Sequence, residues 1–320
     1  MYARSNERDS AVSQPKIPLV PIHEATVLLA GTGRDVAPYI ESEMKHLMSS
    51  TKDFKKVFVL VIESDSADNT IEVLESLKQK IPNFDYLALG KLGGDIPIRT
   101  ERLAYCRNHI IKAVKEDPKY AQVDFVMLAD LDGLNTHLNA ASIAQCWKTD
   151  VPWDVVTANQ LDFYYDVWTL RHKYWSPGDC IVQQSSLEPI LGHDQSINLA
   201  VWAKQAKLPV TAGYVEVDAA FGGFAIYKKQ AYITGHYVGS GVTDGVKHEA
   251  CEHVAHCSDM CKAGYRIFIN SALINCKRPA DQNPQKPKAF SGMMIGAIRS
   301  TGIALFGKKR FQKYLGMLAE

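Results

Sequence analysis

The chain has 320 residues, of which 46% are hydrophobic and 22% charged, and this is enough apolar material for one large core or two modest ones. Its 36 basic and 35 acidic residues give a net charge of +1, so the overall charge gives no reason to expect nucleic-acid binding. Seven cysteines without regular short spacing, and no apolar secretory signal at the start, predict a reducing, cytoplasmic setting rather than a disulfide framework.

The first part of the chain predicts an arm followed by a regular strand and helix pattern. Residues 1–24 are polar and punctuated by prolines, without a periodic apolar face, which predicts a flexible arm. Apolar runs then predict strands at 26–31, 56–62, 84–89 and 124–130, with amphipathic helices between them at about 36–48, after Asp68 and at about 99–115.

This alternation predicts an α/β fold, with a mostly parallel, Rossmann-like central sheet covered by helices on both faces. Ligands of such sheets bind outside the carboxyl ends of the strands. Four carboxylates of the sequence fall at those ends: Glu63, Asp65, Asp130 and Asp132. They would repel one another unless a cation lies among them.

Asp130 and Asp132 follow a buried-strand pattern at spacing i, i+2, in the segment DFVMLADLDGLN. Carboxylate oxygens suit Mg²⁺ or Mn²⁺, which keep open positions for phosphate oxygens. The pair therefore predicts a divalent cation that bridges a diphosphate. The alternative is a solvated surface loop or a helix cap.

After Asp132 the alternation weakens. Strands are expected at 154–159, 217–229 and 265–271, and a helix at about 249–263, with an aromatic-rich segment and a loop of Gly, Asp and Ser residues before them. No long linker divides the chain, so we expect a single domain over 25–285, with a nucleotide-binding half, 25–135, and a sugar and acceptor half, 136–285.

The last segment, 286–320, has an apolar stretch, GMMIGAIRSTGIALF, followed by Lys308, Lys309, Arg310 and Lys313. The stretch is too short to span a bilayer, which needs about 20 apolar residues. It predicts an amphipathic basic tail that either packs on the domain or makes peripheral contact with the inner face of a membrane.

Several motifs, in order, resemble the nucleotide-binding half of GT-A glycosyltransferases: LLAGTGRDVAPYI, VIESDSADNT, RTERLAYCRN and LADLDG. Three later ones are similar to the fungal capsule-associated mannosyltransferase-like group and related bacterial and viral sugar transferases: FYYDVWTLRH, FGGFAIYKK and CEHVAHCSDMCKAGYRIFINSALIN. The resemblance covers roughly residues 25–278. It implies a metal-dependent glycosyltransferase that moves a sugar from a nucleotide-sugar donor to a glycan or lipid-linked acceptor.

The resemblance also implies roles for single residues of the first half. Thr32, Gly33 and Arg34 would lie beside the nucleotide, and Glu63 and Asp65 near its base or ribose. Asp130 and Asp132 would bind ribose, metal and phosphate. Arg107 would lie near the diphosphate or support the acidic loop; the alternative is a purely structural pairing with an acidic neighbour.

In the second half, Asp166 is expected to bond the hydroxyls of the donor sugar, and Arg171 to hold Asp166 or contact phosphate. The cluster at 251–261 lacks the Cys-x-x-Cys pairs of zinc sites. In the resemblance, the pair Glu252–His253 takes the place of the acidic pair that supplies the general base. Either residue is then the base, or His253 completes the metal shell; the alternative is a buried pair with structural hydrogen bonds.

One departure from the superfamily lies just after FINSALI, where a late metal-binding histidine is expected and the chain has Asn275 and Cys276. It favours His253 or His256 as the third ligand. Two other functions compete. A sugar-1-phosphate nucleotidyltransferase should carry a Gly-rich basic loop, of which AGTGRD is a poor version. A glycan-binding protein on a degenerate fold would not need Asp130 and Asp132.

Overall fold

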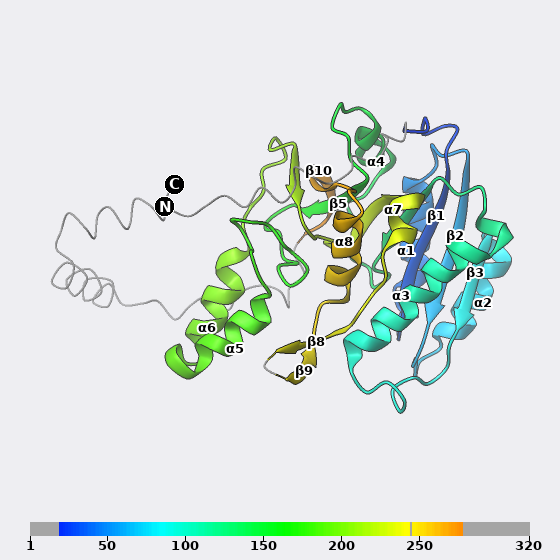
Figure 1. The fold of residues 1–320 in the computed structure, drawn as a ribbon. Helices are drawn as coiled ribbons and strands as arrows, with labels where there is room; N and C mark the ends of the chain where they lie inside the picture. Colours follow the sequence, from blue (N-terminus) through cyan, green and yellow to red (C-terminus); the bar gives the residue numbers. More distant parts are fainter. Residues whose placement is uncertain (1–18, 244, 278–320) are drawn as a thin grey trace. The chain divides into compact units, whose positions relative to one another are not determined.

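The computed structural model describes residues 19–243 and 245–277. Within this part an eight-stranded sheet runs in the order β3-β2-β1-β4-β7-β5-β10-β6, with a separate two-stranded hairpin (Figure 1). The fold is α/β with a mostly parallel central sheet, as the alternation of strands and helices predicts. The predicted tail, 286–320, and most of the predicted arm lie outside the described residues.

The first half follows the predicted order closely. Strands β1 (Thr26–Gly33), β2 (Lys56–Glu63), β3 (Phe84–Ala88) and β4 (Phe125–Ala129) pair in parallel. Helices α1 (Ile40–Ser50), α2 (Thr70–Lys80) and α3 (Arg99–Glu116) connect them. Helix α1 begins a few residues later than predicted.

The second half completes the sheet. Strands β5 (Val155–Gln160) and β10 (Ile267–Cys276) are parallel to each other, whereas β7 (Phe224–Lys228) and β6 (Tyr214–Val217) run antiparallel to their neighbours. The predicted strand at 217–229 is wrong in its first half, because β6 ends at Val217 and β7 begins only at Phe224. Gly222 and Gly223 have φ values of 69° and 84°, which no extended strand adopts, and the chain turns there before β7 begins.

Several elements have no counterpart among the predictions. They include the helices α5 (Cys180–Leu191) and α6 (His193–Ala200), and the hairpin of β8 (Ser240–Thr243) and β9 (Val246–Glu249). The sequence of helix α5, CIVQQSSLEPIL, has no apolar stripe of helical period, and the helix buries only Cys180. The short helices α4 (Ala140–Ala144) and α7 (Lys229–Thr234) flank the sheet, as does α8 (Glu252–Lys262).

The core has two layers, one on each face of the sheet. Side chains of α3, α7 and α8 pack on one face, and those of α1, α2 and α4 pack on the other. The end of the predicted arm joins the second layer, because Leu19, Val20 and Ile22 pack against it and Trp147 Nε1 donates to Val20 O at 2.8 Å. Among the described helices, none has both the length and the apolar character needed to cross a bilayer.

Candidate functional site

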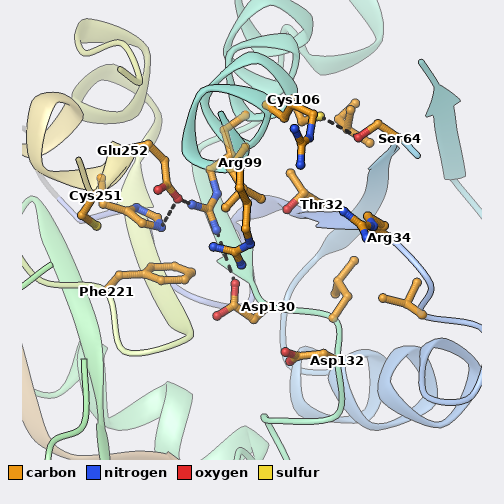
Figure 2. A pocket seen from close by; sticks show the side chains of 18 of the residues that line it. Thr32, Arg34, Ser64, Arg99, Cys106, Asp130, Asp132, Phe221, Cys251 and Glu252 are labelled. Carbon is orange, nitrogen blue, oxygen red and sulfur yellow. Dashed lines mark hydrogen bonds and ion pairs between the residues drawn. The ribbon is translucent and has the colours of Figure 1, made fainter. Parts of the chain in front are cut away.

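A cavity of about 600 Å³ opens at the carboxyl ends of β1, β2 and β4. Loops after these strands form one side of it, and helix α3, the 165–169 segment and the start of α8 form the rest (Figure 2). Most of the predicted site residues line this cavity together: Thr32, Gly33, Arg34, Asp65, Arg107, Asp130, Asp132, Asp166, Glu252 and His253.

The structure does not bring Glu63 and Arg171 into this cavity. Glu63, the last residue of β2, is 1% exposed, and its Oε1 accepts from Ser66 N at 3.0 Å, so it stabilises the turn after the strand. Arg171 is paired with Asp179 at 2.8 Å and lines a different cavity, of about 410 Å³. Glu63 was predicted from its place at a strand end and from the resemblance, and Arg171 as a partner of Asp166 or a phosphate contact. Both side chains have other partners.

The loops after β1, β2 and β3, on one side of the cavity, are joined by hydrogen bonds. Asp35 Oδ1 accepts from Ala67 N at 2.7 Å, which joins the loop after β1 to the loop after β2. Asp65 has a φ of 61°, and its Oδ1 accepts from Leu92 N and Gly93 N at 2.9 and 2.8 Å. Asp65 therefore fixes the loop after β3. In this way Asp65, which itself lines the cavity, also holds the loop after β3 in place beside it.

Asp130 and Asp132 lie at the cavity floor, on one side of the arginines (Figure 2). Burial raises the pKa of Asp130 to about 7, and the carboxylates of Asp132 and Asp166 add to the effect while Arg107 and Arg99 oppose it. The carboxylates of Asp132 and Asp166 therefore lie close enough to Asp130 to disfavour its charge. A divalent cation bound there would favour the charged forms.

The predicted metal shell of Asp130, Asp132 and His253 is not assembled. Among residues 19–243 and 245–277, no group of three or more His, Cys, Asp or Glu side chains could hold a metal ion. The His253 ring stacks on Phe221 with centroids 4.0 Å apart, and its Nε2 lies 3.7 Å from Glu252 Oε1. His256 is fully buried, and its Nε2 lies 2.8 Å from Tyr232 O. Both histidines belong to the aromatic packing of α8.

Two carboxylates nevertheless fit a cation of the Mg²⁺ type. Mg²⁺ is usually held by one or two carboxylates, with waters and substrate phosphates in its other positions. Asp130 and Asp132 supply that number at the floor of an open cavity.

Arg107 joins the acidic motif to the start of α8. It is 5% exposed, its Nη2 lies 3.4 Å from Asp130 Oδ1, and its Nη1 is ion-paired with Glu252. Its guanidinium also lies 5.4 Å from the ring of Phe221. The predicted alternatives for Arg107 were a diphosphate contact, support of the acidic loop and a structural pairing with an acidic neighbour. Its pairs with Asp130 and Glu252 fit the last two.

Asp166 is held in a fixed orientation on the wall that faces the acidic motif. Its Oδ1 accepts from Thr169 Oγ1 at 2.8 Å, and its Oδ2 accepts from Gly222 N at 2.9 Å. A carboxylate oxygen can accept a second hydrogen bond, so Asp166 keeps capacity for a ligand hydroxyl. Trp168 lines the same wall, and its Nε1 has no hydrogen-bond partner among the described residues.

Sequence reasoning missed two arginines that line the cavity, Arg99 and Arg102. Both lie in the motif RTERLAYCRN at the start of α3, and Figure 2 shows Arg99 reaching toward Asp130 from that helix. Their spacing of three residues, continued by Cys106 and Arg107, puts them on one helix face. That spacing is the signal that could have identified them.

The comparisons with known proteins leave the family open. No family model and no curated protein matches the chain. Among solved structures, the mannosyltransferase PcManGT of Pyrobaculum calidifontis, in complex with GDP-Man and Mn²⁺, has 14% identity and a TM-score of 0.42, over 88% of this chain and 63% of that one. TarS 1–349 of S. aureus, in complex with UDP-GlcNAc, has 15% identity and a TM-score of 0.40, over 77% of this chain and 56% of that one. The chain thus spans less than two thirds of their lengths, and likenesses of this size do not bear on its activity.

Proposed function

We propose that this chain is a glycosyltransferase that moves a sugar from a nucleotide-sugar donor to a glycan or lipid-linked acceptor, with Mg²⁺ or Mn²⁺ as cofactor. One observation carries the proposal. The pair Asp130 and Asp132 lies at the floor of a cavity of about 600 Å³, at the carboxyl ends of parallel strands, where arginines also gather: Arg34, Arg99 and Arg102. Carboxylates for a cation and guanidinium groups for phosphate are the two requirements of a bound nucleoside diphosphate.

The donor side of the cavity is assigned as follows. Asp130 and Asp132 would hold the cation, which would supply positive charge for a leaving diphosphate. Arg99 and Arg102, at the start of α3, face the phosphates, and the bound-together loops after β1, β2 and β3 enclose the nucleoside. Preorganised positive groups of this kind stabilise the charge that grows on a leaving group.

The acceptor side contains Asp166, Glu252 and His253. Asp166, fixed by Thr169 and Gly222, is placed to bond sugar hydroxyls. Burial lowers the pKa of His253 well below its usual value, with Arg107 adding to the effect, so the imidazole stays neutral but is a weak base. Glu252 and His253 are both kept as candidate bases, because they take the place of the acidic pair in the resemblance. The likeness of the motifs to the capsule-associated group extends this proposal to surface polysaccharide.

Calorimetry of the full chain tests the proposal. UDP-, GDP- and dTDP-sugars are titrated with and without Mn²⁺ into the protein, into Asp132→Ala and into Asp53→Ala. Asp53 is an exposed residue before β2, outside the cavity, and serves as the matched control. We expect one nucleotide to bind in a Mn²⁺-dependent way to the protein and to Asp53→Ala, and not to Asp132→Ala. Metal-dependent binding of none of the three would refute the proposal.

A glycan-binding protein without transferase chemistry is the second candidate, and one contact favours it. The buried ion pair between Arg107 and Glu252 stabilises the ionised carboxylate and so opposes its use as a base. If the protein is of this second kind, the parent chain and Asp132→Ala bind oligosaccharide equally well. Neither shows metal-dependent nucleotide binding in the same titrations.

A further inference from the structure

A chain of buried amide side chains lies behind the cavity, outside its lining. It consists of Gln160 at the end of β5, Asn275 near the end of β10 and Asn135 in the loop after β4, and each is at most 1% exposed. Gln160 Nε2 donates to Asn275 Oδ1 at 3.2 Å, and Asn275 Nδ2 donates to Asn135 Oδ1 at 3.2 Å. These side chains add to the backbone bonds between the three elements, in which β5 pairs with β10 and His137 N donates to Asn275 O at 2.7 Å.

One end of this amide chain holds the acidic motif. Asn135 Nδ2 donates to the carbonyl of Asp130 at 2.7 Å and to the carboxylate of Glu43, on α1, at 2.8 Å. The amide of Asp130 donates to Gly223 O at 2.9 Å. The peptide groups on both sides of the Asp130 side chain are therefore fixed by hydrogen bonds, one of them from the amide chain.

The other end holds the opposite wall. The carbonyl of Gly222 accepts from Asn275 Nδ2 at 2.8 Å and from Gln160 Nε2 at 3.0 Å, while its amide donates to Asp166 at 2.9 Å. A series of hydrogen bonds thus runs from Asp166 through Gly222, Asn275 and Asn135 to Asp130.

Asn275 is the member of the amide chain that bonds both to Asn135, on the side of the acidic motif, and to Gly222, on the side of Asp166. The space around it is tight. A Cβ added at Gly223 would lie 3.1 Å from Asn275 Nδ2 and 3.5 Å from Asp130 Oδ2, so the amide and the carboxylate flank the same turn. An asparagine side chain has two N–H donors and a carbonyl, and here both of its ends have partners. A leucine of similar size has neither.

We propose that Asn275 is a positioning residue of the donor site: its amide sets the acidic motif of Asp130 and Asp132 at a fixed place relative to the wall that carries Asp166. The inference rests on the proposed function. It assigns this role to the position where the superfamily resemblance expects a metal-binding histidine, so that orientation of the motif replaces direct ligation at this point of the chain.

The test compares Asn275→Leu with Asn270→Leu. Asn270 lies on the same strand, is 3% exposed and donates to Tyr214 and Cys146, away from the cavity. Both variants lose buried hydrogen bonds, so both should unfold at lower urea concentration. Groups that orient metal ligands typically change affinity 10- to 100-fold when removed, so Asn275→Leu should weaken Mn²⁺-dependent donor binding about tenfold or more. Asn270→Leu should leave it within about twofold of the parent, as a residue with a purely structural role would.

Amide hydrogen exchange on the metal-free protein is the second readout. The amides of residues 130–135 should exchange faster in Asn275→Leu than in Asn270→Leu, because only the first loses its link to Asn135. Gln160→Met, which keeps the bond between Asn275 and Gly222, serves if Asn275→Leu does not fold, and should show both changes more weakly. Equal exchange at 130–135 in the two leucine variants, or unchanged donor binding in Asn275→Leu, overturns the inference. Absence of metal-dependent binding in the parent protein would instead remove the proposed function, and the positioning role would fall with it.

Discussion

The ion pair of Arg107 gives the sharpest prediction. In Arg107→Met the carboxylate of Glu252 keeps its buried place but loses its cationic partner. The side chains of Arg107 and Glu252 are each 6% exposed, so water cannot solvate the carboxylate that is left unpaired. Removing one partner of a buried pair costs about 3–5 kcal/mol of unfolding free energy. Asp130, with 31% of its side chain exposed, loses a weaker contact and adds less.

Urea unfolding of the metal-free protein, followed by tryptophan fluorescence, measures this cost. The matched control is Arg266→Met, because the pair of Arg266 with Glu216 is 43% and 39% exposed and should be worth at most about 1 kcal/mol. The double variant Arg107→Met/Glu252→Gln should recover much of the loss, since no unpaired charge remains. If Arg107→Met costs no more than Arg266→Met, the pair is not the stabilising link described above.

Three further predictions concern the same region. Glu252→Gln should lower kcat about 10²- to 10⁴-fold in a transfer assay without changing donor affinity, if Glu252 is the base. Gly223 has a φ of 84°, and a Cβ added there would lie 3.1 Å from Asn275 Nδ2. Gly223→Ala should therefore lower the free energy of unfolding in urea by about 1–3 kcal/mol. The loss should exceed that of Gly90→Ala, where φ is 69° and nothing lies within 4 Å of the added Cβ. Burial lowers the pKa of His256 to about 4. Stability should therefore be lost as pH falls from about 6.5 to 4, where the unfolded chain binds a proton that the folded chain does not, at a cost of roughly 3 kcal/mol. His256→Phe should abolish this loss when unfolding is measured against pH.

The first half of the fold could be predicted because its signals are local. Each of β1, β2 and β4 is a continuous apolar run, buried on both faces, and each ends at the residues that line the cavity. In a parallel sheet those ends meet at one edge, so chain order alone places Asp65 and Asp130 near each other. The predicted contact of Glu63 was lost at the same edge, because its side chain turns back to the amide of Ser66.

The second half could not be predicted equally well, because its contacts are not local. The sequence of helix α5 has no hydrophobic pattern of helical period, because the helix buries only Cys180 and needs no apolar face. Arg171 carries the charge expected of a phosphate contact, yet its partner is Asp179, the N-cap of α5, a helix that the sequence did not reveal. The amide chain through Asn275 joins residues more than 100 positions apart and has no sequence signature.

Helix α3 unites these two halves physically. Its buried residues, including Ile110 and Val114, pack on the sheet, while Arg99, Arg102 and Arg107 line the cavity. The start of the helix thus lies at the cavity with the loops after β1 and β2, and its middle reaches the acidic motif and α8. One rigid element therefore sets the distance between the groups assigned to phosphate and the groups assigned to the acceptor. A site built in this way depends on the register of α3 against the sheet, which its apolar face fixes. The positions of the three arginines thus follow from the packing of the core.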